Sequence, residues 1–252
     1  MNMIRRLIFL AAFIVTAFVA QNARAVEPLR IAIAHSFRDD FLPVQELMQT
    51  RYHVEFSSVY ATAKGKGGSE ENPSRVTNLD ELHKVDVILS NFYRTWIPPD
   101  QMESVKKAFR TKPVVGIRKA NHGFQNWLEF DSEVFGMDYR GHHGGRNHRI
   151  AAGQEKNPLV AGFDPIEPDG GYYGHRDFAD DVTPLLVITP GKKGNDDEVM
   201  PQTFLRVNKE TGQRSFYTRY GPESVKNHES VRDLVVHALF WAADKDERDY
   251  RK

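Results

Sequence analysis

Runs of apolar residues divide the first half of the chain into short strands separated by polar segments. Residues 29–36 (LRIAIAHS), 85–91 (VDVILSN) and 113–117 (PVVGI) are almost continuously apolar, and residues 53–59 (HVEFSSV) form a more mixed run. Strands of this kind are buried on both faces, which is typical of a parallel sheet covered by helices on both sides. The pattern therefore predicts an α/β protein with a mostly parallel sheet.

The segments between the strands carry the spacing of amphipathic helices. Residues 39–50 place four apolar side chains near one helical face, with Pro43 in the first turn. Residues 98–109 have Asp100 as a predicted N-cap and Glu103 three residues later. The last helix shows the clearest i, i+3, i+4 pattern, at Val231, Leu234, Val235, Ala238, Leu239 and Ala242.

The second half is less regular but still reads as α/β. Residues 184–189, 203–207 and 214–219 have the composition of strands, and a turn (NKETGQ) joins the last two. No internal repeat and no interdomain linker interrupts the chain. We therefore predict a single domain over residues 26–252.

The N-terminal residues have the order of a signal peptide. A basic start (MNMIRR), an apolar run and the sequence Ala23-Arg24-Ala25 predict cleavage after Ala25 and a periplasmic or secreted location. No other apolar run is long enough for a membrane span, so we expect no membrane association after cleavage. The chain has 34 basic and 34 acidic residues and no cysteine. This balance argues against a nucleic-acid partner, and cysteine is excluded as nucleophile or metal ligand.

Polar residues follow the predicted strands at the edge where open α/β sheets bind ligands. His35 ends the first strand, Asn91 the third, and Arg118 and His122 follow the fourth. We expect His35, Arg118 and His122 to line one pocket. Glycine-rich segments further on add candidates that suit the wall of a polar pocket: His142, His143, Tyr172, Tyr173 and His175.

Other kinds of site have weaker support. A zinc site could be built from His35, His122 and His142 or His143, although no H-E-x-x-H spacing occurs. No G-x-S-x-G motif supports a serine nucleophile. The acids of residues 127–136 (WLEFDSEVFG) alternate as on an amphipathic helix, so we expect them to face water.

Several motifs together resemble a known family. The segments PVVGIRKANHGFQNWLEFDSEVFGMDYRGHHG, NPLVAGFDP, TPLLVIT, RSFYTRYG and VVHALFWAAD follow one another as in the ThuA-like (trehalose utilisation) proteins. These proteins belong to the class I glutamine amidotransferase-like superfamily. The resemblance extends over residues 29–244 and implies a flavodoxin-like fold and a role in carbohydrate metabolism.

The resemblance also places Arg118 where true amidotransferases carry their cysteine nucleophile. Arginine stays protonated and has only donors, so glutaminase activity is not expected. Its guanidinium suits a carboxylate, a phosphate or sugar hydroxyls. The chain departs from the family pattern at Asn157-Pro158 and Tyr220-Gly221, where relatives often have histidines, and this puts a shared mechanism in doubt.

We therefore predict an exported protein that binds or acts on a small-molecule carbohydrate. Its alternatives are a non-catalytic sugar-binding accessory protein and a histidine-based metallohydrolase. If the protein is an enzyme, His122 is the predicted acid or base and Arg118 orients the substrate. The alternative for this pair is structural: Arg118 would pair with an acid such as Asp39 or Asp40, and His122 would cap a helix toward Trp127. No cofactor is assigned, and a homo-oligomer is left open. The predicted substrate-binding residues are His35, Asn91, His142, His143 and Tyr173.

Overall fold

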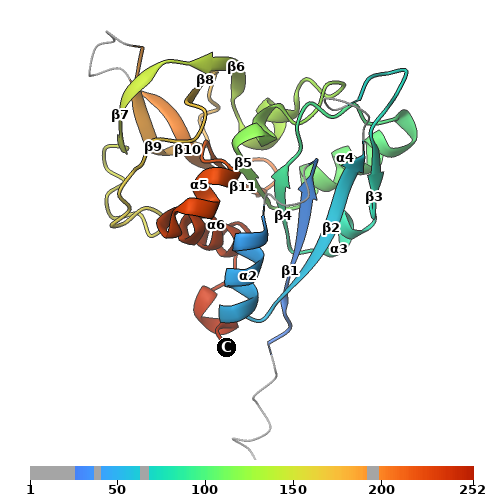
Figure 1. The fold of residues 1–252 in the computed structure, drawn as a ribbon, viewed down its shortest axis with the longest axis horizontal. Helices are drawn as coiled ribbons and strands as arrows, with labels where there is room; N and C mark the ends of the chain where they lie inside the picture. The colour runs from blue at the N-terminus through green and yellow to red at the C-terminus, as the bar shows by residue number, and fades with distance from the viewer. Residues whose placement is uncertain (1–25, 37–40, 63–67, 192–198) are drawn as a thin grey trace, which may run out of the picture.

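The computed structural model describes residues 26–36, 41–62, 68–191 and 199–252 (Figure 1). The predicted signal peptide and residues Asp39 and Asp40 lie outside the described residues. Among the residues that are described, no helix is long and apolar enough to cross a membrane.

Parallel strands form the centre of a nine-stranded sheet in the described part of the chain, in the order β2-β1-β4-β5-β11. This order is that of the flavodoxin-like fold, so the predicted fold class is confirmed. Strands β1, β4, β5 and β11 match apolar runs because both of their faces are covered, whereas β2 is only partly buried. Their bounds are β1 Leu29–His35, β2 Val54–Thr62, β4 Val87–Asn91, β5 Val114–Ile117 and β11 Arg214–Thr218.

Antiparallel strands extend the sheet at both edges, which makes it more mixed than we predicted. The predicted hairpin of the second half is present as β10 and β11, and β9 continues it. The edge strand β3 was not predicted, because its exposed polar residues hide the strand pattern. The added strands are β3 Arg75–Thr77, β7 Gly145–Ile150, β9 Val182–Pro190 and β10 Met200–Val207.

Helices cover the two faces of the sheet. Helices α2 (Leu42–Arg51), α5 (Pro222–Asn227) and α6 (Glu229–Ala242) pack on one face, and the predicted apolar stripe of α6 is buried. Helices α3 (Glu81–Lys84) and α4 (Pro99–Thr111) pack on the other. A short 3-10 helix, η3, follows α6 at Glu247–Tyr250.

The start of α4 corrects one prediction. Pro98, with extended backbone, is the N-cap, and Asp100 lies inside the first turn. Two prolines favour this start because the ring fixes φ and the missing N–H is not needed at the first helical position. The Asp100 carboxylate instead pairs with Arg75 at 2.6 Å.

A small second sheet lies above β5 and β11 in the view of Figure 1. Strands β6 (Asp138–His143) and β8 (Tyr172–Arg176) form it. The amphipathic helix predicted at residues 127–136 is reduced to a π-helical turn, η2 (Asp131–Phe135), whose apolar residues fill the space beside β5. Asp131 does not face water as we predicted, because its carboxylate binds the backbone N–H of Tyr139 at 2.7 Å.

Candidate functional site

Strand β5 ends in a sharp turn at Arg118. The φ angle of this residue is +43°, a left-handed conformation that costs a non-glycine residue about 1 kcal/mol. The buried Tyr217 hydroxyl donates to the Arg118 carbonyl at 2.7 Å and holds the turn in place. The 3-10 helix η1 (Arg118–His122) then begins, so that Arg118 and His122 both lie at the carboxyl edge of the sheet.

Arg118 pairs with Asp169, which precedes β8 in the chain. The same carboxylate accepts from the Ser224 hydroxyl at 2.6 Å and from the Gly221 backbone at 3.0 Å. Burial alone would raise the pKa of Asp169, but the Ser224 hydrogen bond and the Arg118 charge lower it overall. Asp169 is therefore an anion that fixes the Arg118 guanidinium. Sequence reasoning missed this acid because 51 residues separate the pair.

His122 is held by a chain of three hydrogen bonds that also sets its tautomer. His175 Nδ1 lies 2.9 Å from the Pro201 carbonyl, which can only accept, so Nδ1 is the donor. His175 Nε2 therefore accepts from the Asn121 amide nitrogen at 3.0 Å, and Asn121 Oδ1 accepts from His122 Nδ1 at 2.6 Å. The described residues provide no partner for His122 Nε2, which keeps its electron pair. The predicted helix cap toward Trp127 is absent, because residues 123–129 form no helix.

The surroundings keep His122 neutral. Its pKa is lowered to about 3, mainly by burial and then by the positive charges of Arg94 and Arg219. Burial also lowers the pKa of His175 to about 4. An imidazole in this environment stays uncharged near neutral pH and presents a lone pair at Nε2.

Aromatic rings surround the His122 ring. Tyr139 stacks on it with a centroid distance of 4.3 Å and an angle of 9°. Tyr93 and Tyr173 meet it edge-on, each at 5.5 Å. Asp131 holds the Tyr139 backbone, and burial raises the pKa of Asp131 to about 6.

Arg219 completes this group from beneath Tyr173. Its guanidinium lies 3.9 Å from the Tyr173 ring centroid, and Nη2 donates to the Gly170 carbonyl at 2.9 Å. Only 1% of Arg219 is exposed, and burial lowers its pKa. We did not predict this residue, although it follows β11 as Arg118 follows β5, so the same strand-end rule would have found it. We call His122, Tyr139, His142, Tyr173 and Arg219 the His122 cluster.

The two adjacent histidines of β6 point in different directions. The His142 ring meets Tyr173 edge-on at 5.1 Å and so belongs to the His122 cluster. Both residues are exposed, and His143 Nδ1 donates to the Gly144 carbonyl at 2.6 Å. Successive side chains of a strand alternate, so only one of the two can face the cluster.

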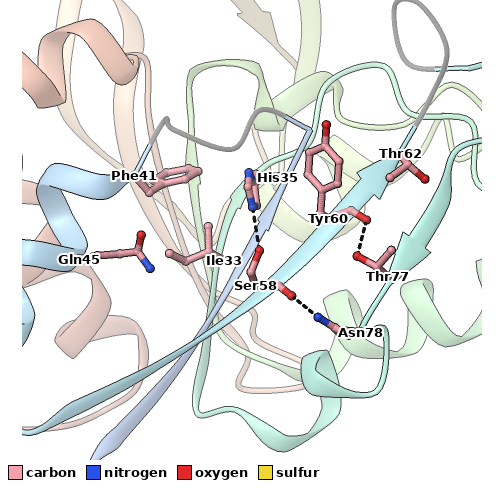
Figure 2. Close-up of a pocket in the computed structure, with 9 residues that line it drawn as sticks. All are labelled: Ile33, His35, Phe41, Gln45, Ser58, Tyr60, Thr62, Thr77 and Asn78. Atoms are coloured by element: carbon pink, nitrogen blue, oxygen red, sulfur yellow. Dashed lines mark hydrogen bonds between the residues drawn. The ribbon is translucent and has the colours of Figure 1, made fainter.

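His35 does not lie in the His122 cluster, which corrects the expectation of a single pocket. It shares the face of Ile31 and Ile33, toward α2, and its Nε2 lies 3.1 Å from the Ser58 hydroxyl (Figure 2). Asn91 is its register partner on β4 and is fully buried. The hollow beside His35 has a volume of about 360 Å³ and is lined by Ile33, His35, Phe41, Gln45, Ser58, Tyr60, Thr62, Thr77 and Asn78.

The described residues bring together no group of three or more His, Asp or Glu side chains that could hold a metal ion. The proposed zinc ligands are separated because His35 faces α2, whereas His122 and His142 lie in the cluster. The metallohydrolase alternative therefore has no ligand set within the described part of the chain.

The architecture is that of ThuA-like proteins. A protein described as ThuA-like from Parabacteroides merdae ATCC 43184 superimposes with a TM-score of 0.60 at 13% identity, covering 88% of this chain and 92% of that one. A second, from Bacteroides uniformis ATCC 8492, gives a TM-score of 0.56 at 15% identity, covering 89% and 95%. No family model and no curated protein sequence matches the chain. The ThuA-like, flavodoxin-like fold implied by the sequence motifs is thus confirmed.

Proposed function

We propose that the protein binds a carbohydrate at the His122 cluster and uses His122 as a general base. The observation that carries this proposal is a neutral imidazole whose Nε2 electron pair is available and whose other nitrogen is tied to Asn121. A base must be unprotonated at working pH and fixed in direction, and His122 meets both conditions. The resemblance of the sequence motifs to the ThuA-like (trehalose utilisation) proteins supports a sugar as the ligand.

The cluster supplies the other groups that a proton abstraction needs. His122 Nε2 would take a proton from a sugar hydroxyl or from a carbon next to a carbonyl. The negative charge that develops on the substrate oxygen would be stabilised by the positive charges of Arg219 and Arg118. The negative charge on the substrate oxygen, next to the His122 ring, would raise the proton affinity of Nε2 during the reaction. The tyrosine rings offer flat surfaces against which a sugar ring can lie.

Glutaminase activity is not part of the proposal. Arg118 occupies the turn that follows β5, and an arginine cannot form the thioester that releases ammonia. We expect no ammonia from glutamine with the wild-type protein. Release that survives purification and disappears in Arg118→Ala would contradict the assignment of this turn.

We also propose that the protein is exported with removal of its first 25 residues. The support is the order of basic, apolar and small residues at the N-terminus. N-terminal sequencing of protein from the periplasm or medium should give Val26. An intact Met1 on membrane-bound protein would contradict it.

Variants of three histidines test the function. On a panel of glycosides and keto-sugars, His122→Ala should lower turnover at least about 100-fold, because one positioned base contributes that much. His142→Ala should weaken sugar binding, since its ring contacts Tyr173. His143→Ala is the matched control, because this adjacent residue faces away, and it should behave as wild type.

The result also separates an enzyme from a binding protein. Sugar binding that depends on His122 and His142 without turnover on any panel member would make the protein a carbohydrate-binding accessory. A lower melting temperature in His122→Ala with unchanged sugar binding would leave His122 a purely structural residue and would contradict the proposal.

A further inference from the structure

Two guanidinium groups lie side by side at the edge of the His122 cluster. Gly170 lies against both: a Cβ atom on this glycine would be 2.6 Å from Arg118 Nη2 and 3.5 Å from Arg219 Nη2. Two positive charges this close repel each other. After burial, the positive charge of Arg118 also lowers the pKa of Arg219. An arrangement of this kind is stable when anions lie between or beside the cations.

The described residues supply one anion for the two cations. Asp169 pairs with Arg118. Tyr173 and Tyr217 stay neutral there, because burial raises the pKa of both hydroxyls. The next acid along the chain, Glu167, accepts from the Tyr172 hydroxyl at 2.6 Å. The two guanidinium groups therefore share the single carboxylate of Asp169, which leaves one positive charge in excess in the described part of the chain.

Hydrogen-bond donors of Arg118 and Arg219 also lack acceptors. Arg219 uses Nη2 on the Gly170 carbonyl, whereas its buried Nε and Nη1 have no partner among the described residues. The buried Nε of Arg118 also has none. Unpaired charged donors in a protein interior are strongly unfavourable, and an arginine with a purely structural role would direct them at backbone carbonyls. These donors suit the oxygens of a carboxylate or phosphate.

We infer that Arg118 and Arg219 form the binding site for an oxyanion carried by the substrate, a carboxylate or a phosphate group on a sugar. This inference rests on the proposed carbohydrate function and names its substrate class. About a fifth of the Arg118 side chain is exposed, so the anion approaches past Arg118 toward the buried Arg219. Tyr173 contacts both Arg219 and His122, which places the anionic group about one aromatic ring away from the reacting atom.

Calorimetric titration of the full chain tests the inference with four probes: glucose, glucuronate, glucose 6-phosphate and inorganic phosphate. We expect glucuronate or glucose 6-phosphate to bind at least about tenfold more tightly than glucose, the difference that one charge-assisted pair makes. The two acidic sugars separate a carboxylate-bearing substrate from a phosphorylated one.

Variants test whether the preference for acidic sugars depends on Arg118 and Arg219. Arg118→Gln and Arg219→Gln should each abolish the preference for the acidic sugar. Arg214→Gln is the matched control, because Arg214 lies at the opposite end of β11 and pairs with Asp244 at 2.8 Å. It should keep the full preference. If Arg219→Gln does not fold, the partly exposed Arg118 still decides the question.

Each outcome has a definite meaning. Equal binding of glucose and glucuronate, lost in His122→Ala but kept in Arg118→Gln, would overturn the oxyanion site and leave the carbohydrate function standing. Binding of phosphate that needs Arg118, with no affinity for any sugar, would support the oxyanion site and overturn the carbohydrate function. No binding of any anion at millimolar concentration would overturn the inference.

Discussion

Asn121 connects two buried imidazoles, and its amide determines which nitrogen of His122 carries the proton. In Asn121→Leu, His122 Nδ1 and His175 Nε2 both lose their partner, so we expect a loss of about 1–3 kcal/mol in the free energy of unfolding for each group left unpaired. Nitrogen NMR of histidine-labelled protein should show His122 protonated at Nδ1 in the wild type and a mixture of tautomers in the variant.

The signal of His83 is the internal control for this measurement. Its Nε2 lies 2.9 Å from the Ser104 hydroxyl, between α3 and α4 and outside the His122 cluster, and should not change. A wild-type His122 protonated at Nε2 would contradict both the hydrogen-bond chain and the general-base assignment.

Arg219 and Asp169 should respond in opposite ways to loss of their charge. Arg219→Met removes a buried cation whose donors are mostly unpaired, and its stability should equal or exceed that of the wild type. Asp169→Asn leaves two guanidinium groups without their anion and should lose about 3 kcal/mol, as broken buried pairs do. Urea unfolding measures both. Equal losses in the two variants would show that Arg219 has a structural role.

Strand β5 and the π-helical turn η2 touch at a glycine. A Cβ atom on Gly116 would lie 2.5 Å from the end of the Phe135 ring and 3.2 Å from Ala120. Gly116→Ala should therefore overpack this contact and lower the free energy of unfolding by about 1–3 kcal/mol. Because η2 leads to Tyr139, sugar binding should weaken as well.

Gly144→Ala is the control for this substitution. The nearest atom to a Cβ there is 3.9 Å away, so the methyl group fits. Urea unfolding of the two variants should differ clearly, and equal stability would mean that Phe135 moves aside without loss.

The main elements were predictable because burial leaves a strong pattern in the sequence. Strands β1, β4 and β5 are apolar on both faces, and the stripe of α6 repeats over its full length. Strands β6 and β8 were missed, since they are short and rich in Gly, His and Tyr. A two-stranded sheet exposed on one side has too few apolar positions to show a period of two.

The candidate site was predictable in part. Arg118 and His122 follow from the rule that parallel strands end at one edge, whereas Asp169 and Tyr139 come from segments whose position the sequence does not indicate. The displacement of His35 could have been predicted. It shares the odd-numbered face of Ile31 and Ile33, which packs against α2, so its ring had to turn away from η1.

The free energy of unfolding should begin to fall as soon as the pH drops below about 6.5, because the chain buries neutral histidines. The pKa values of His122 and His175 are lowered from 6.5 to about 3 and about 4 by burial, and that of His148 is lowered too. Below pH 6.5 the unfolded chain binds protons at these rings and the folded chain does not. The free energy of unfolding should therefore drop by up to about 1.4 kcal/mol per pH unit for each of His122 and His175 between pH 6.5 and pH 4, and His148 should add to this drop.

Asp131 opposes this effect. Its pKa is raised from 3.8 to about 6 by burial, so between these values the folded chain binds a proton that the unfolded chain does not. Replacing the carboxyl group in Asp131→Asn should make the free energy of unfolding fall more steeply as the pH is lowered. Urea unfolding at about pH 7.5 and about pH 5 measures both slopes, and a stability that stays constant over this range would contradict the burial of the histidines.

The two sheets divide the site between them in a way that bears on how such proteins diverge. The turns after β5 and β11 carry Arg118, His122 and Arg219, and they cannot change without disturbing the central sheet. Strand β6, in contrast, carries Tyr139 and His142 on a half-exposed ribbon that contributes nothing to that sheet. Selection can therefore exchange the residues of β6 to suit a different ligand while the charged groups beneath stay the same.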